Sequence, residues 1–136
     1  MGLFREFEIA LRDIIKNDNL SAEEALRKIL ETLTDACEHN KKLFSVLLNY
    51  LMQLKKSGVD TSERVRRRVI RVRHLLSTIL IKGIQAGEFK ELNVKDANET
   101  LYGLMESAIF RIAVLNQDNL ADIKAALNTT VDLYKA

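Results

Sequence analysis

The chain has 136 residues, a net charge of +2 and one cysteine, Cys37. A chain of this length forms one domain and buries about two thirds of its unfolded surface, so it needs no disulfide to fold. Apolar residues at 47% and charged residues at 29% exclude a disordered chain. The nearly balanced charge gives no overall attraction to nucleic acid, and the lone cysteine fits a reducing cytosol.

The first residues, MGLFREFEIA, include charges and lack the apolar core of a signal peptide. No run of about eighteen apolar residues follows, so we expect a cytoplasmic protein that does not contact the membrane. The chain has no proline and five glycines. Because tight turns between strands usually need more of both, this composition favours an all-α fold.

Helical spacing of apolar residues predicts six helices, taken here in chain order. The first covers about residues 3–16 and ends in an Asn-Asp-Asn turn. The second begins at the clearest local signal, the capping box of Ser21 and Glu24, and ends at Asn40. The third covers about residues 42–57 and is apolar over half its circumference, so it should pack on more than one side.

The last three helices are expected at residues 62–86, 93–115 and 120–134. Gly87 is the expected end of the long fourth helix, and Asn93 is the expected cap of the fifth. No linker, repeat or low-complexity segment interrupts the pattern. The sequence therefore predicts an all-α, six-helix bundle that forms a single domain over residues 1–136.

Residues that could act in catalysis or bind a metal are scattered along the chain. His39 and His74 are far apart, and together with Cys37 they have no zinc-binding spacing. No Glu-x-x-His pair, glycine-rich phosphate loop or G-x-S-x-G motif is present. Cys37 falls on an apolar helix face, as a small core residue does, and the carboxylates fall on exposed faces or caps. We therefore expect no metal, no cofactor, no catalytic residue and no enzyme.

The segment from Leu76 to Leu104, LSTILIKGIQAGEFKELNVKDANETLYGL, combines an apolar helix, a glycine-containing turn and a second long helix. The turn and the following helix start contain Gly83, Gly87, Glu88, Phe89, Asp96 and Ala97. With the earlier stretch EHNKKLFSVLLNYL, this pattern resembles the C-terminal domain of TetR-type (tetracycline repressor-like) transcriptional regulators. The resemblance covers nearly the whole chain and includes the number of helices.

The resemblance implies the effector-binding and dimerisation domain of such a regulator. A small apolar or amphipathic effector would enter a pocket between the central helices and shift the spacing of two DNA-binding modules. The effector must favour one helix arrangement over another for this to happen. The family's N-terminal helix-turn-helix module is not in this sequence, so DNA would be bound only through an N-terminal domain absent from this chain.

Residues 63–74 contain six arginines on two flanks of one helix. One stripe consists of Arg64, Arg67, Arg68, Arg71 and Lys82. Because many acidic residues are available and no aromatic side chain interleaves the stripe, we interpret it as a solvated, paired face rather than a phosphate contact. Arg66 and Arg73, seven residues apart, lie on the other flank, where either could reach a pocket or a second subunit.

The third and fifth predicted helices have more apolar surface than one interface requires, so we expect them to enclose a ligand pocket. Its expected apolar lining is Phe44, Leu47, Leu48, Leu51, Leu80, Met105 and Ile109. Tyr102 and Arg73 are its expected polar groups. The alternative is that these are ordinary core residues with no cavity between them.

The fifth helix also has an apolar strip opposite its core face, where a helix facing water should be polar. The strip consists of Gly103, Ser107, Phe110 and Val114, spaced four, three and four apart as in a packing seam. The last helix offers a comparable stripe of Leu120, Ile123, Leu127, Val131 and Tyr134. Two such helices from each of two subunits would form a four-helix bundle, so we expect a homodimer.

Two other functions stay open at this point. A ligand-free helical module for protein–protein interaction would also need exposed apolar strips, and the presence of a cavity separates it from the sensor domain. A small helical enzyme is a third possibility, which the scattered carboxylates disfavour.

Overall fold

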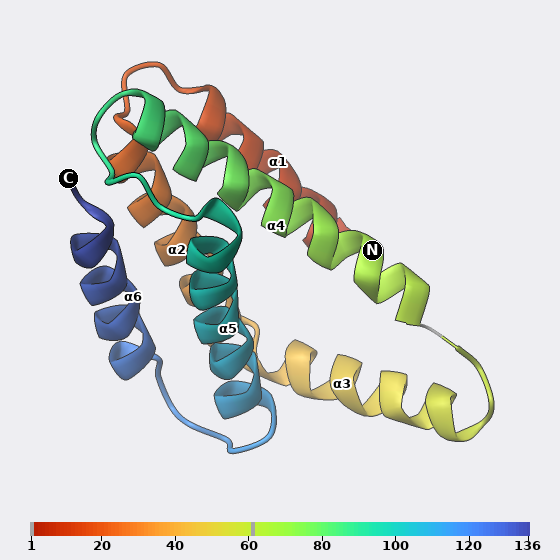
Figure 1. Ribbon diagram of the computed structural model, residues 1–136. Helices are drawn as coiled ribbons and strands as arrows, with labels where there is room; N and C mark the ends of the chain where they lie inside the picture. The colour runs from red at the N-terminus through yellow and green to blue at the C-terminus, as the bar shows by residue number, and fades with distance from the viewer. Residues whose placement is uncertain (1, 61) are drawn as a thin grey trace.

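The computed structural model describes residues 2–60 and 62–136, without the side chains of Gly2, Leu3, Phe4, Phe7, Leu47, Ser62, Arg64 and Val65. Its helices are α1 (Gly2–Lys16), α2 (Ala22–His39), α3 (Lys41–Lys56), α4 (Ser62–Gln85), α5 (Val94–Ala113) and α6 (Ala121–Tyr134). Figure 1 shows them packed side by side except for α3, which projects from the bundle. The all-α class and the six predicted helices are confirmed.

Two helices form the centre of the bundle: α2 contacts all five other helices, and α5 contacts α2, α3, α4 and α6. α1 and α4 run side by side in the same direction (Figure 1). Near the start of both helices, Glu8 pairs with Arg68 and Arg71. Near their ends, the Lys82 ammonium reaches the carbonyl of Ile15. In the described part of the chain, α3 contacts only α2 and α5, and α4 returns to the bundle from the far end of α3.

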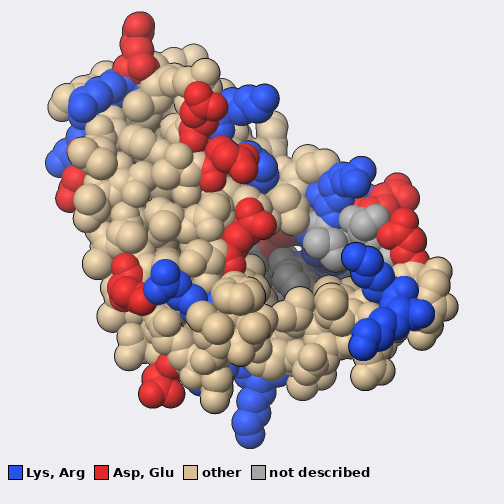
Figure 2. All heavy atoms as spheres, turned by 60° about the horizontal axis from the view of Figure 1, so that its bottom comes forward, with Lys and Arg blue, Asp and Glu red and all other residues tan. Residues whose placement is uncertain are grey.

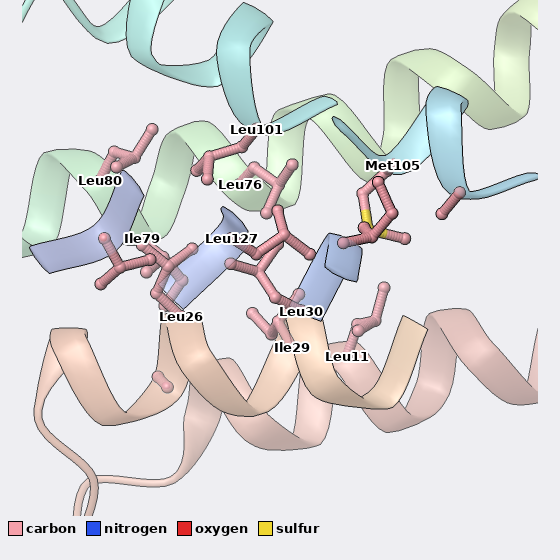
Figure 3. Close-up of a cluster of buried hydrophobic side chains, with 14 of the residues drawn as sticks. Leu11, Leu26, Ile29, Leu30, Leu76, Ile79, Leu80, Leu101, Met105 and Leu127 are labelled. Atoms are coloured by element: carbon pink, nitrogen blue, oxygen red, sulfur yellow. The ribbon is translucent and has the colours of Figure 1, made fainter. Parts of the chain in front are cut away.

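One hydrophobic core joins α1, α2, α4, α5 and α6. Figure 3 shows side chains of α2 facing those of α4, with side chains from α1, α5 and α6 closing the cluster. Its fully buried large members include Leu11, Leu26, Ile29, Leu76, Ile79, Leu80, Leu101, Ile112, Leu120 and Val131. Burying one side chain of this size stabilises the fold by about 2 kcal/mol. Among the described side chains of α3, only the half-buried Phe44 packs against this core.

The turn between α4 and α5 holds two distant parts of the chain together. Gly87 has a φ of 76°, a conformation that glycine adopts without strain, and the amide of Glu88 closes α4 by donating to the Gly83 carbonyl at 2.9 Å. The Glu88 carboxylate then accepts hydrogen bonds from the backbone amides of Ala22 and Glu23, at 3.1 and 3.2 Å. These amides belong to the first turn of α2 and have no partner within that helix. The turn therefore caps α2 from across the bundle.

The C-terminal residues pair with the same turn. The amide of Lys90 donates to the Tyr134 carbonyl at 2.9 Å, and the amide of Ala136 donates to the Glu88 carbonyl at 3.0 Å. The Tyr134 hydroxyl donates to the Ala97 carbonyl in the first turn of α5 at 2.9 Å. These bonds fix the end of α6 beside the start of α5.

Candidate ligand site and dimer surface

Arg73 of α4 and Tyr102 of α5, the two predicted polar groups of the ligand site, lie against each other. The guanidinium carbon of Arg73 is 5.2 Å from the centroid of the Tyr102 ring, within the range of a cation–π interaction. The same guanidinium forms an ion pair with Glu99, one turn earlier on α5. Sequence reasoning found Arg73 and Tyr102 but missed Glu99, although its spacing of three from Tyr102 places it on a neighbouring part of α5.

A buried asparagine fixes α4 against α5 beside this cluster. The Nδ2 of Asn98 donates to the Arg73 carbonyl at 2.7 Å and to the Ser77 hydroxyl at 2.6 Å. Asn98 is only 3% exposed, and its Oδ1 accepts no hydrogen bond from the described residues. Because an unpaired buried acceptor costs free energy, this contact is a weak point of the α4–α5 interface.

The phenol of Tyr102 has a mixed electrostatic environment. Burial raises its pKa, Glu106 and Glu99 raise it further, and Arg73 opposes them. Tyr102 therefore stays neutral at physiological pH and offers a hydroxyl donor next to a cation and two carboxylates.

The predicted ligand residues of α3 belong to a helix that contacts α5 but, in the described part of the chain, not α4. Phe44 packs against the core, while Leu48 and Leu51 are half-buried without joining it. α3 is attached to α5 through its early turns, where the Ser45 hydroxyl donates to the Ala113 carbonyl at 3.4 Å. Leu47 was predicted to line the pocket as well, but its side chain lies outside the described residues.

The remaining predicted ligand residues do not share one wall. Leu80 and Met105 are core residues with exposures of 0% and 6%, whereas Ile109 is 37% exposed. Leu80 is completely covered by its neighbours in this structure, and its place in the lining of an enclosed ligand cavity stays a prediction. Two recesses of about 240 and 410 Å³ lie elsewhere, beside the α1–α2 turn and on α2, and no predicted ligand residue lines them.

Figure 2 shows the molecule hollowed between the body of the bundle and the arm that residues 41–74 form. The described parts of the arm are α3, residues 57–60 and the first half of α4. Lysine and arginine side chains lie along one side of this hollow (Figure 2). α3 and α4 make no contact with each other in the described part of the chain, so the hollow continues from the body of the bundle between these two helices.

The predicted strip on α5 lies at the surface. Phe110 and Val114 are 52% and 50% exposed, and Gly103 has open space where a Cβ would be. Ser107 is half-buried because its hydroxyl accepts a hydrogen bond from the Arg111 Nε at 3.2 Å. Large apolar side chains are therefore exposed on the side of α5 opposite its core face, as a packing seam requires, and the dimer stays a prediction.

Residues 19–109 match the family described as the tetracyclin repressor-like, C-terminal domain. The chain belongs to this family. The match begins just before α2 and ends inside α5, so it includes the G-x-x-x-G-E-F turn on which the resemblance rests. No curated protein sequence and no solved structure matches the chain.

The aliphatic stripe of α6 faces the core of this TetR-type domain, whereas the prediction placed it at the interface between two subunits. Leu120, Ile123, Leu127 and Val131 are at most 3% exposed, because α2 and α5 of the same subunit cover them. Tyr134 is half-buried and bonded to Ala97. The prediction that this stripe forms a dimer interface is therefore wrong for the four aliphatic residues, which are core residues of the subunit.

The outer face of α6 is a different set, which sequence reasoning missed. It consists of Ala121, Ala125, Thr129 and Leu133, all exposed and spaced four residues apart. Leu133 is 65% exposed, and the other three side chains are small. The regular spacing was visible in the sequence, but the longer aliphatic stripe on the same helix is the stronger signal.

The arginine stripe of the TetR-type domain is paired as interpreted. Arg67 forms an ion pair with Glu63 at 3.1 Å, and both Arg68 and Arg71 lie 3.4 Å from Glu8 of α1. The side chain of Arg64 lies outside the described residues. The exposed Arg67–Glu63 pair lies within α4 and contributes little to stability, about 0.2–1 kcal/mol, whereas the two pairs with Glu8 connect α4 to α1.

Other candidate groups show no sign of chemistry. Burial, with a smaller effect of Glu38, raises the pKa of the Cys37 thiol to about 11, which keeps it protonated. His39 is exposed and bonded through Nδ1 to the Asp35 carbonyl at 2.7 Å. Among the described residues, no three metal-ligating side chains come together. The described helices are also too short or too polar to cross a membrane.

Proposed function

We propose that this domain senses a small apolar or amphipathic effector and dimerises, as part of a TetR-type transcriptional regulator. Operator DNA would be contacted by a helix-turn-helix domain outside these 136 residues. Because such a regulator acts on DNA, we place the protein in the cytoplasm. We assign it no catalytic activity.

The observation that carries this proposal is the double role of α5. One face of α5 presents Tyr102 to Arg73 of α4, and a second face, about a quarter to a third of the way round the helix, presents Phe110 and Val114 to the surface. A helix is rigid over this length, so a shift caused by a ligand on one side is felt at the other side. The same helix thus links a candidate ligand site to a candidate subunit interface.

The alternative is an interaction module without a ligand. It is supported by the position of Leu80 and Met105, which are packed in the core instead of lining an open cavity. Both proposals include the dimer, and they differ only in whether a small molecule binds between α3, α4 and α5.

Thermal unfolding separates the two. A panel of apolar and amphipathic small molecules should contain compounds that raise the Tm, because a ligand that binds only the folded state stabilises it. Tyr102→Ala should abolish the rise, whereas Ile9→Ala, which shortens an exposed side chain of α1, a helix without any proposed ligand residue, should leave it intact. A flat response to the whole panel from a dimeric protein would favour the ligand-free module.

A further inference from the structure

The arm carries the excess positive charge of the molecule. Residues 41–74 contain ten lysines and arginines and only two acidic residues, so their net charge is +8, whereas the rest of the chain carries −6. α3 alone has four lysines and no acidic residue. At physiological salt the Debye length is about 8 Å, so neighbouring cations of the arm act together on an anion that approaches it.

The arm also exposes many large apolar side chains. They are Leu43, Val46, Tyr50, Met52, Val59 and Ile70, of which Val46 is 64% exposed. Leu43, Val46 and Tyr50 are spaced three and four residues apart, so they share one face of α3, and soluble proteins rarely leave such a face exposed without a function. Nucleic acid would use the cations but not the apolar groups, and a neutral apolar molecule would use only the latter. A surface with both features fits an amphiphile with a negative head group.

Two arginines place positive charge on the side of α4 that faces the hollow. Arg73 faces α5, since it lies over the Tyr102 ring. Arg66 is two turns earlier on the same flank of α4, and it is exposed. On the other flank, Arg71 is turned towards Glu8 of α1. Arg66 and Arg73 are therefore the guanidinium groups placed to receive an anion between α3, α4 and α5.

We propose, building on the ligand function above, that the effector is a single-chain anionic amphiphile. Its apolar chain lies along Leu48 and Leu51 of α3, and its head group binds between Arg66 and Arg73. The head group competes with Glu99 for the Arg73 guanidinium, because both are anions for one cation. Binding thus loosens the Arg73–Glu99 pair, one of the links between α4 and α5, and shifts the arrangement of the two helices.

Three probes with the same twelve-carbon chain test the head group: laurate, dodecanol and dodecyltrimethylammonium. Each is titrated calorimetrically into the protein below its critical micelle concentration. Laurate should bind about tenfold tighter than dodecanol, as expected for one charge-assisted contact, and the cation should bind most weakly. If dodecanol or the cation binds as tightly as laurate, a ligand site exists but the anionic preference is refuted. If none of the three binds, the proposed ligand function itself fails.

A matched pair of variants tests the place of the head group. Arg66→Gln should weaken laurate binding about tenfold and leave dodecanol binding unchanged. Arg67→Gln is the control, because Arg67 is the next residue, is also exposed and is paired with Glu63 on the other flank. Since both positions are at the surface, neither variant should unfold the protein. Equal losses in the two variants would contradict the proposal, because they would mean general attraction to the basic arm.

Binding to lipid vesicles tests whether the anionic head group belongs to a free amphiphile or to the surface of a bilayer. Phosphatidylglycerol vesicles should not bind the wild-type chain at physiological salt when laurate does. Vesicle binding that Arg66→Gln and Arg67→Gln weaken alike would assign the arm to a membrane surface and overturn the proposal.

Discussion

The ring of Phe89 lies against the backbone of Gly83, where any other residue would place its Cβ. A Cβ at position 83 would be 2.1 Å from Cδ2 and 2.3 Å from Cε2 of that ring. Phe89 is 2% exposed and belongs to the core, so the ring has no free space to move into. The first glycine of the G-x-x-x-G-E-F turn is therefore required by close packing, not by backbone conformation.

Gly83→Ala should consequently destabilise the domain, although alanine normally favours a helix. Overpacking costs about 1–3 kcal/mol, and the gain in helix propensity returns up to about 1 kcal/mol. Urea unfolding of Gly83→Ala, Phe89→Leu and the double variant measures this. The alanine should cost less free energy in the Phe89→Leu background, because the smaller side chain can yield. Additive losses would show that the two residues do not collide.

Glu88 should stabilise α2 from a distance of more than sixty residues in sequence. Glu88→Ala removes the acceptor of two backbone amides, at Ala22 and Glu23, and should lower the free energy of unfolding by about 1–2 kcal/mol. Glu91→Ala, an exposed glutamate in the same turn region, is the control and should change stability by less than about 0.5 kcal/mol. Equal effects of the two variants would mean that the long-range cap contributes nothing.

Cys37 should be unreactive in the folded protein. Its buried thiol has a pKa of about 11, above the usual value of 9.0, so almost no thiolate is present at pH 8. Labelling with Ellman's reagent should be slow at pH 8 and should become fast in urea at the unfolding midpoint. Because the pKa is higher in the folded chain, the unfolded chain loses the thiol proton first as the pH rises. The contribution of Cys37 to the free energy of unfolding is therefore full below pH 9 and is lost as the pH rises towards 11. Rapid stoichiometric labelling of the folded chain would contradict this burial.

The chain by itself should not recognise a DNA sequence. Arg67, Arg68 and Arg71 are paired with carboxylates, so part of the charge of the arginine stripe is already neutralised. In a gel-shift titration at physiological salt, binding should be weak, independent of sequence and abolished by more salt. Nanomolar affinity for one sequence over another would refute this prediction.

Much of the fold could be predicted from local signals. Ser21 and Glu24 form both bonds of the capping box, and the Asn93 side chain accepts from the amide of Asp96. These features depend on residues within one turn, so a single sequence contains all the information needed. The predicted end of α5 was less accurate: the helix stops at Ala113, and Asn116 takes a φ of 56° in the loop that follows.

The candidate site could be predicted only in part. Periodicity shows that a helix has an apolar stripe, but not which neighbour covers it. Leu127 and Phe110 each belong to such a stripe, yet Leu127 is covered within the subunit and Phe110 is not. Arg73 and Tyr102 were each predicted as a polar group of the ligand pocket, and the structure brings them into contact, although the pocket itself stays a prediction. Glu99 was missed, since an exposed glutamate on a helix looks the same in sequence whether or not it has a partner.

The most direct test of the central claim is sedimentation equilibrium of the wild type, Phe110→Glu and Tyr50→Glu. Phe110 and Tyr50 are aromatic residues of similar exposure, 52% and 59%, on different helices. The wild type and Tyr50→Glu should be dimers at micromolar concentration. Phe110→Glu should be a monomer, because a buried unpaired charge costs about 3 kcal/mol or more, a loss of at least about 100-fold in affinity. A monomeric wild type, or a Phe110→Glu variant that dimerises as tightly as the wild type, would contradict the assignment of α5 as the dimer helix.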